Sequence, residues 1–370
     1  MIIREIELRI ISLPLKRTFE TSFGRESVKR ALIITIREND LEGFGECVAM
    51  PTPYYSYETV NTAWYVISEF MVPRILGKDF KKPEDLIKAL ERIRGHNMAK
   101  SALECAFLDL FCKKAGIPLK DYLRGVRNKI ESGVSIGIQP NIKSLLDLID
   151  HYLDKGYRRI KVKIKPNWDV NIVREIRKEF GEIPLMVDAN AAYSLADLEV
   201  FRLLDRYNLM MIEQPLGYDD LIDHSELQRL IKTPICLDES VKSVNDLKVA
   251  IKLRSCKVLN IKIGRVGGIL NAIKMHDLCL KNRIPVWCGG MLETGIGRAF
   301  NVAIASLPNF KFPNDISASD RYFDEDIIEP PFMLNRDGTI NVPTKPGIGV
   351  DIVKERLERA TLKKAVFKLD

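Results

Sequence analysis

The sequence lacks the marks of a secreted, membrane or nucleic-acid-binding protein. It has no CxxC pair, no low-complexity linker and no apolar run long enough to cross a bilayer. Its first residues, MIIREIELRIISL, lack the basic leader and long apolar core of a signal peptide. The net charge of +7 arises from 57 basic and 50 acidic residues, without a dense Lys/Arg block interleaved with aromatics. We therefore expect a cytoplasmic protein that binds neither nucleic acid nor a membrane.

Cysteine use agrees with that compartment. The seven cysteines are odd in number, and several lie in apolar strand or helix contexts, such as Cys236 in PICLDES. This pattern favours buried free thiols in a reducing environment over disulfides.

The hydrophobic pattern divides the 370 residues into three parts. Residues 1–125 predict an N-terminal α+β capping domain of three strands followed by helices, at 2–13, 31–37, 43–48, 59–70, 83–93 and 99–115. Residues 126–325 alternate short apolar runs with helix-period segments: GVSIGI, RIKVKIK, IPLMVDAN, LMMIEQP, PICLDES, KVLNIKIG, IPVWCGG and FKFPNDISAS. Eight such units predict an α/β fold of the (β/α)8 TIM-barrel type. Residues 326–370, with a charged helix near 353–363, are expected to pack back on the capping domain.

Ionisable residues end five consecutive runs at a nearly constant spacing. By subtraction of residue numbers, the gaps are 25, 25, 25 and 24 for Lys163, Asp188, Glu213, Asp238 and Lys262. One βα unit is about that long, so each side chain falls at the same point of its repeat, the C-terminal mouth of the barrel. Barrel enzymes hold their catalytic groups at this mouth.

The three carboxylates in this set predict a metal site. A carboxylate after a strand is often only a helix cap, and Asp188 could serve as one, but Glu213 is followed by Gln-Pro and caps weakly. Three anions that converge in a low-dielectric mouth repel one another unless a cation lies among them. Hard oxygen ligands without a His or Cys pattern favour Mg²⁺, with Mn²⁺ as an alternative ion, over Zn²⁺. Asp188, Glu213 and Asp238 are therefore the predicted ligands.

The basic side chains of the stretch RIKVKIK can be interpreted in two ways. Its period of two places Arg159, Lys161, Lys163 and Lys165 on one strand face, and such a face is ordinarily solvated. Its position one βα unit before the carboxylates changes the reading for Lys163, the predicted base, and for Lys161. For Arg159 and Lys165 the ordinary reading stands.

The two lysines that flank the carboxylate block are candidates for general acid/base chemistry. Lys163 comes before the block and Lys262 after it, so a closed barrel places them on opposite sides of a bound ligand. A second nearby cation lowers a lysine pKa toward neutrality, and we expect Lys161 to act so on Lys163 and Arg265 on Lys262. The arrangement predicts a carboxylate substrate on Mg²⁺, loss of its α-proton and a metal-stabilised enediolate.

These motifs resemble a known family. The chain is similar to the muconate-lactonizing subgroup of the enolase superfamily in KVK, VDAN, IEQP, LDES and NIK, at 161–163, 187–190, 212–215, 237–240 and 260–262. Within the subgroup, WCGGMLETGIGRAFN, IKIGRVGG and PNDISASDRYF resemble the branch of o-succinylbenzoate synthase and N-acylamino acid (N-succinylamino acid) racemase. The chain departs from the usual residues of that branch at Asn167, Ala191, Ile263 and Phe300.

The resemblance implies roles for further residues. It implies that Asp188, Glu213 and Asp238 bind Mg²⁺, that Lys163 and Lys262 form the acid/base pair, and that Glu239 and Asn190 support the ligands from behind. Ser135 and Glu293 are placed to touch the ligand or to close loops. Phe23 and Tyr55 belong to TSFG and PYYSYET, which resemble substrate-covering loops. These two residues and Phe19, which precedes TSFG, either wall the pocket or pack the cap.

The activity implied by the resemblance is dehydration of a cyclohexadiene carboxylate to o-succinylbenzoate, as in menaquinone biosynthesis, racemisation of N-succinylamino acids, or both. The same five residues serve both reactions, and the resemblance further implies a homo-oligomer, a dimer or an octamer. A muconate cycloisomerase-like or dipeptide epimerase-like member remains an alternative, although the Asp-x-Asp element of the epimerases is absent. From other classes, the alternatives are a Schiff-base lysine aldolase and a non-enzymatic anion-binding barrel.

Overall fold

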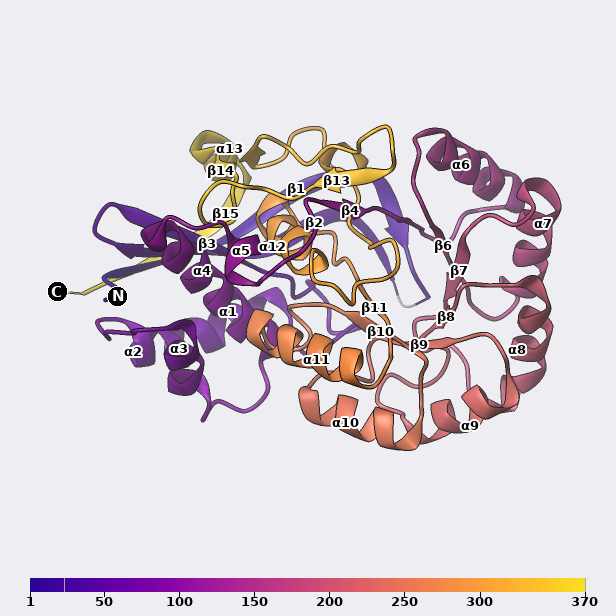
Figure 1. The fold of residues 1–370 in the computed structure, drawn as a ribbon. Coiled ribbons are helices and arrows are strands. Elements are labelled where there is room, and N and C mark those ends of the chain that lie inside the picture. Colours follow the sequence, from indigo (N-terminus) through magenta and orange to yellow (C-terminus); the bar gives the residue numbers. More distant parts are fainter. Residues whose placement is uncertain (23, 370) are drawn as a thin grey trace.

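The computed structural model describes residues 1–22 and 24–369 and contains a parallel curled sheet beside an antiparallel one (Figure 1). The antiparallel sheet has the strand order β15-β1-β2-β3. Its members are β1 (Glu5–Glu20), β2 (Arg25–Glu38), β3 (Leu41–Cys47) and β15 (Thr361–Lys368). Helical segments follow β3 in the chain: α1 (Val60–Val66), the π-helical turn η1 (Ile67–Met71), α2 (Val72–Ile75), α3 (Pro83–Leu90), α4 (Asn97–Ala115) and α5 (Leu119–Tyr122).

Helix α4 is the long helix that covers the antiparallel sheet. It ends at Ala115 because Gly116 adopts a left-handed conformation with φ of 67°, as the sequence Gly-Ile-Pro predicts. The glycines of GFGE in β3 allow α4 to lie against the strand. A Cβ on Gly43 would lie 2.2 Å from the carbonyl oxygen of Ala106, and one on Gly45 would lie 2.1 Å from that of Ala102.

The parallel sheet contains seven strands in sequence order, from β5 to β11. They are β5 (Val134–Ile136), β6 (Ile160–Lys163), β7 (Leu185–Asp188), β8 (Ile212–Glu213), β9 (Ile235–Leu237), β10 (Val258–Ile261) and β11 (Val286–Cys288). The helices between and after them are α6 (Ile142–Asp154), α7 (Val170–Phe180), α8 (Leu198–Leu204), α9 (Ile222–Leu230), α10 (Val244–Leu253), α11 (Ile269–Lys281) and α12 (Gly295–Ala305). Figure 1 shows helices α6 to α11 as an outer ring around these strands. The predicted barrel is confirmed.

The eighth predicted strand, FKFPNDISAS, closes the barrel without forming a regular strand. Phe310 bridges to Val286 of β11, and Asn314 bridges to Ser132 on the other side. Proline 313 between them has no N–H group for a ladder, which explains why the pairing stays irregular. The run still joins both edges of the sheet, because Asp315 N donates to Cys288 O at 2.8 Å and Gly133 N donates to Asn314 O at 2.7 Å.

The last segment returns to the antiparallel sheet. It contains β12 (Ile328–Glu329), β13 (Thr339–Asn341), β14 (Asp351–Ile352) and α13 (Lys354–Ala360), and it ends in β15, which runs antiparallel to β1. The helix predicted over 353–363 is therefore too long, because from Thr361 the chain joins the sheet edge and β pairing replaces the helical turn.

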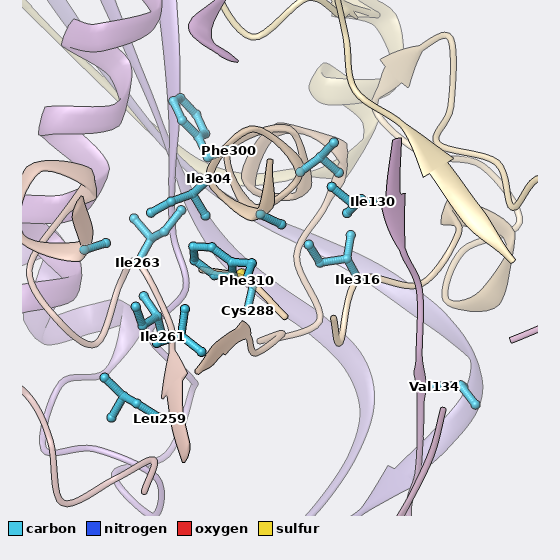
Figure 2. Packing of buried hydrophobic residues seen from close by; sticks show 14 of the residues in the cluster. Ile130, Val134, Leu259, Ile261, Ile263, Cys288, Phe300, Ile304, Phe310 and Ile316 are labelled. Atoms are coloured by element: carbon cyan, nitrogen blue, oxygen red, sulfur yellow. The ribbon is translucent and has the colours of Figure 1, made fainter. Parts of the chain in front are cut away.

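Two large hydrophobic cores and a small third one fill the structure. One belongs to the barrel and its helices, and Figure 2 shows part of it, with Phe300, Ile304, Ile263 and Phe310 close together. A second lies between the antiparallel sheet and its helices, and a third, around Trp287, lies inside the barrel. All seven cysteines are buried and free, as predicted. No helix within residues 1–22 and 24–369 is both long and apolar enough to cross a membrane.

Candidate active site

The barrel strands bring the five regularly spaced ionisable residues to one mouth. Lys163, Asp188 and Glu213 are the last residues of β6, β7 and β8, while Asp238 and Lys262 directly follow β9 and β10. Lys163 is paired in register with Asp188, and Asp188 with Glu213. Each of the five is at most 7% exposed. The repeat spacing in the sequence thus becomes a compact buried cluster of charges.

Each flanking lysine is in contact with a carboxylate. Lys163 Nζ donates to Asp188 Oδ2 and to Asn190 Oδ1, both at 2.6 Å. Lys262 Nζ donates to Asp238 Oδ2 at 2.7 Å. Both amines line the same cavity, so a ligand there meets an ammonium group from each lysine.

Lys161 lies at the centre of the cluster, two residues before Lys163 in β6. Its Nζ is 3.0 Å from Glu213 Oε2, 3.3 Å from Asp188 Oδ2 and 3.0 Å from Asp315 Oδ2. Although burial opposes the charged form, Asp315, Glu213 and Asp188 raise the pKa of Lys161 above its ordinary value. Lys161 therefore favours its charged form beside Lys163.

The two candidate bases differ in their electrostatic environment. Burial lowers the pKa of Lys163, and the neighbouring ammonium of Lys161 lowers it further. The pKa of Lys262 is raised instead: burial opposes the charge, but Tyr55, Glu239 and Glu213 outweigh it. The expectation that Arg265 lowers the pKa of Lys262 is therefore wrong. The guanidinium of Arg265 is occupied by Asp238 Oδ1 and by Asn260 O, at 2.5 Å for the latter.

The carboxylates respond to one another. The pKa of Glu213 is raised, first by burial and then by the charge of Asp188 on the neighbouring strand. The pKa of Asp188 is lowered because Lys163 and Lys161 outweigh the effect of burial. Among the described residues, no group of three or more His, Cys, Asp or Glu side chains has the spacing of a metal site. Cationic side chains hold all three predicted ligands instead.

Two polar residues, Asn190 and Glu239, lie behind the cluster and contact each other. Asn190 Nδ2 donates to Glu239 Oε1 at 3.0 Å, and Asn190 N donates to Asp188 Oδ1 at 3.0 Å. The backbone of Asn190 is left-handed, with φ of 44°, which turns its side chain back toward the mouth. Glu239 Oε2 is buried and has no hydrogen-bond partner within the described part of the chain.

Sequence analysis missed two members of the cluster. Asp315 accepts from Ser135 Oγ at 2.6 Å, and Lys161 and Arg159 bring its pKa to about 2 against the effect of burial. Asn260 Nδ2 donates to Glu213 Oε1 at 2.6 Å. Asp315 lies 53 residues after Lys262 by subtraction, about two repeat lengths, so the same spacing rule could have identified it.

The cavity over the cluster has a volume of about 150 Å³, and residues of both the capping domain and the barrel line it. It is lined by Phe19, Thr21, Gly24, Arg25, Glu26, Met50, Thr52, Tyr54, Tyr55, Ser135, Lys161, Lys163, Asn190, Lys262, Gly290, Met291, Leu292, Asp315 and Tyr322. Phe19, Tyr55 and Ser135 are thus wall residues, and the Phe19 ring centroid lies 6.0 Å from Lys163 Nζ. Glu293 turns its carboxylate back to Met291 N at 2.9 Å and does not line the cavity. Phe23 lies outside the described residues.

Tyr55 joins the capping domain to the barrel cluster. Its hydroxyl donates to Asp238 Oδ1 at 3.0 Å and accepts from Lys262 Nζ at 3.1 Å. We expect Tyr55→Phe to fold normally and to lower kcat/KM about tenfold, since two hydrogen bonds to charged groups are lost. Steady-state kinetics checks this, with Tyr65→Phe as the control, because Tyr65 is 58% exposed and does not line the cavity. Equal kinetics for both variants would contradict the prediction.

Gly289 fixes the space available to Lys262. A Cβ at this position would lie 2.3 Å from Asn260 Oδ1 and 2.7 Å from Lys262 Cε, so both side chains would have to move. We expect Gly289→Ala to lower kcat about a hundredfold, as misplacing a catalytic group by about 1 Å does. Gly217→Ala is the matched control, since the nearest atom there is at 3.5 Å. Unchanged kcat in a folded Gly289→Ala variant would show that Lys262 tolerates displacement.

Comparison with known proteins adds an independent line of observation. Residues 5–124 match the family "Mandelate racemase / muconate lactonizing enzyme, N-terminal domain", and residues 144–356 match "Enolase C-terminal domain-like". The chain is 50% identical over 360 residues to an o-succinylbenzoate synthase of Geobacillus kaustophilus, covering 97% of this chain and 96% of that protein. It is 47% identical over 362 residues to an N-succinylamino acid racemase of Thermus thermophilus, covering 98% of each. A solved enolase-superfamily structure from Listeria innocua aligns with a TM-score of 0.96 at 42% identity, over 100% of both chains.

Proposed function

Because the chain belongs to the enolase superfamily, in the group of mandelate racemase and muconate lactonizing enzymes, we propose that it removes the α-proton of a carboxylate substrate as an o-succinylbenzoate synthase, an N-succinylamino acid racemase or both. The observation that carries the proposal is the pair of lysines, Lys163 and Lys262, which line one cavity on either side of three buried carboxylates. A lysine at each face of an α-carbon can remove a proton or return one.

The donor set fits a divalent cation. Members of the superfamily generally use Mg²⁺. In the buried cluster, five carboxylates lie among five cationic side chains: Asp188, Glu213, Asp238, Glu239 and Asp315 among Arg159, Lys161, Lys163, Lys262 and Arg265. The predicted ligands offer only oxygen donors, which suit Mg²⁺. Asp188, Glu213 and Asp238 would hold the ion, and Mn²⁺ could replace it.

The ion would supply electrostatic stabilisation of the negative charge that develops on the substrate carboxylate. The chain's own residues do the proton chemistry. In the synthase reaction, Lys163 takes the α-proton and returns it to the departing hydroxyl on the same face, while Lys262 remains an ammonium group and stabilises the enediolate by its charge. In racemisation, each lysine acts on its own face, one as base and the other as acid.

The surrounding residues orient these groups. Lys161 stays cationic beside Lys163, and Asn190 positions Lys163 through its side-chain oxygen. Tyr55 covers Lys262 from the capping domain, and with Phe19 it would exclude water from the cavity. We further propose that the protein acts as a homo-oligomer in the cytoplasm and that its synthase product enters menaquinone biosynthesis, in keeping with the activities named for its relatives.

Turnover assays with purified protein and Mg²⁺ test the proposal. One arm follows dehydration of the cyclohexadiene carboxylate by loss of its diene absorbance, and another follows N-succinyl-L- and D-amino acids by optical rotation. Muconate and a dipeptide serve as comparison substrates. Turnover in either of the first two arms supports the proposal, whereas turnover of muconate or dipeptide alone would overturn it.

A further inference from the structure

One wall of the cavity is a short backbone segment after β11. Gly290, Met291 and Leu292 line the cavity, and the preceding Gly289 lies against Lys262. Leu292 has a left-handed backbone with φ of 56°, a conformation that a leucine adopts only when its surroundings enforce it. We call residues 290–292 the wall segment.

The middle of the wall segment is held by a lysine of the capping domain. Lys29 lies in β2, is 5% exposed and donates from Nζ to Met291 O at 2.9 Å. A buried ammonium needs partners for its charge, and its other contact is Glu46 Oε1 at 3.7 Å. The ammonium group of Lys29 therefore contacts the wall segment and Glu46 rather than solvent.

The chain just beyond the wall segment is held by Glu46, which lies in β3 of the same sheet and is 5% exposed. Its Oε2 accepts from Thr294 N at 3.1 Å, Thr294 Oγ1 at 2.7 Å and Gly297 N at 3.0 Å. These N–H groups belong to the N-terminal turn of α12, where a carboxylate is favoured. Barrel residues complete the frame, since Glu293 Oε1 accepts from Met291 N and Arg298 donates to Glu293 O at 2.7 Å.

We infer that Lys29 and Glu46 are positioning residues, which hold the wall segment at the distance from Lys163 and Lys262 that substrate binding requires. The inference rests on the proposed function, because the wall affects turnover only if the cavity binds substrate. It gives strands β2 and β3 of the capping domain a part in the site, in addition to Phe19 of β1 and the loop that carries Tyr55.

A second carboxyl group of the capping domain, that of Glu104, distinguishes this positioning role from a contact that only holds the two domains together. Glu104 of α4 is 2% exposed and accepts from Leu270 N, at the start of α11, at 2.7 Å. It therefore makes the same kind of contact across the same interface, but neither Glu104 nor Leu270 lines the cavity. Glu104→Gln is thus the matched control for replacing a buried carboxyl group at the interface.

Hydrogen–deuterium exchange of the full chain tests the hold on the wall segment without relying on activity. The variants are Lys29→Met and the double variant Lys29→Met/Glu46→Gln, which leaves neither buried charge without its partner. We expect amide exchange in the peptide covering residues 289–297 to rise about tenfold in both, and to stay unchanged in Glu104→Gln. Unchanged exchange in the Lys29 variants would overturn the inference, whether or not the wild-type protein turns over substrate.

Kinetics then tests the consequence for the site. We expect Lys29→Met to raise KM about tenfold with kcat within about threefold, since the lysine pair and the carboxylates are untouched, and Lys29→Arg to restore KM. Faster exchange with an unchanged KM, or an equal KM change in Glu104→Gln, would overturn the positioning role. A wild-type protein without turnover would overturn the proposed function instead. Hydrogen–deuterium exchange alone would then show whether Lys29 holds the wall segment in place.

Discussion

Replacing Lys163 or Lys262 by alanine is expected to lower kcat about a thousandfold, the size of effect that removal of a general acid/base group produces. Neither substitution leaves a buried carboxylate alone. Asp188 keeps its ion pair with Lys161, and Asp238 keeps that with Arg265. The variants should therefore fold, and circular dichroism checks this before the kinetics is measured.

The stretch RIKVKIK supplies the matched control for these lysines. The Lys165 side chain is 42% exposed and lies 3.8 Å from Glu20 at the surface. Lys165→Ala should keep kcat within about twofold, as expected for an exposed ion pair of small energetic value. A Lys262→Ala variant with wild-type kcat in both the synthase and the racemase assays would contradict the role given to this residue.

Removal of divalent cations is expected to abolish turnover, and added Mg²⁺ should restore it. The physical reason is that Asp188 and Glu213, two of the three predicted ligands, are in register on adjacent buried strands, where their charges repel each other unless a cation lies between them. Mg²⁺ at about 100 times its Kd should also stabilise the fold by about 2.7 kcal/mol, because binding favours the native state. Activity assays with EDTA, followed by excess Mg²⁺, and thermal melting in both states measure the two effects.

Asp188→Asn provides the variant that accompanies the chelation experiment. It removes one charge from the predicted ligand set and should abolish both turnover and the Mg²⁺-dependent rise in Tm. A protein that keeps its turnover in EDTA and is inactivated by borohydride in the presence of substrate would instead be a Schiff-base enzyme.

The site could be predicted from the sequence largely because a barrel repeats. One βα unit of about 25 residues places Lys163, Asp188 and Glu213 in register, and no tertiary information is needed to count residues. The same count extends to Asp315, which was missed because the eighth run contains Pro313 and has no clean strand pattern.

The alternation of residues within RIKVKIK did not predict which side chains are buried. Arg159 was expected to be solvated, but it is 1% exposed and lies inside the barrel, where it donates to Pro313 O at 3.2 Å. A period of two separates two faces of a strand but does not say whether a face meets solvent or the polar interior of a closed barrel.

The contacts between the domains could not be predicted from the sequence. The Lys29 contact to Met291 joins residues 262 positions apart, and the contacts of Tyr55 and Glu46 also cross between domains, so no local sequence pattern indicates them.

Exchange of the substrate α-proton tests the central claim most directly. The protein is incubated with Mg²⁺ and N-succinyl-L- or D-amino acids in D₂O, and loss of the α-proton signal is followed by NMR. We predict Mg²⁺-dependent exchange in the wild-type protein, with at least one enantiomer losing exchange in each single lysine variant. No exchange with these substrates, together with no dehydration of the cyclohexadiene carboxylate, would contradict the assignment of Lys163 and Lys262 to α-proton abstraction.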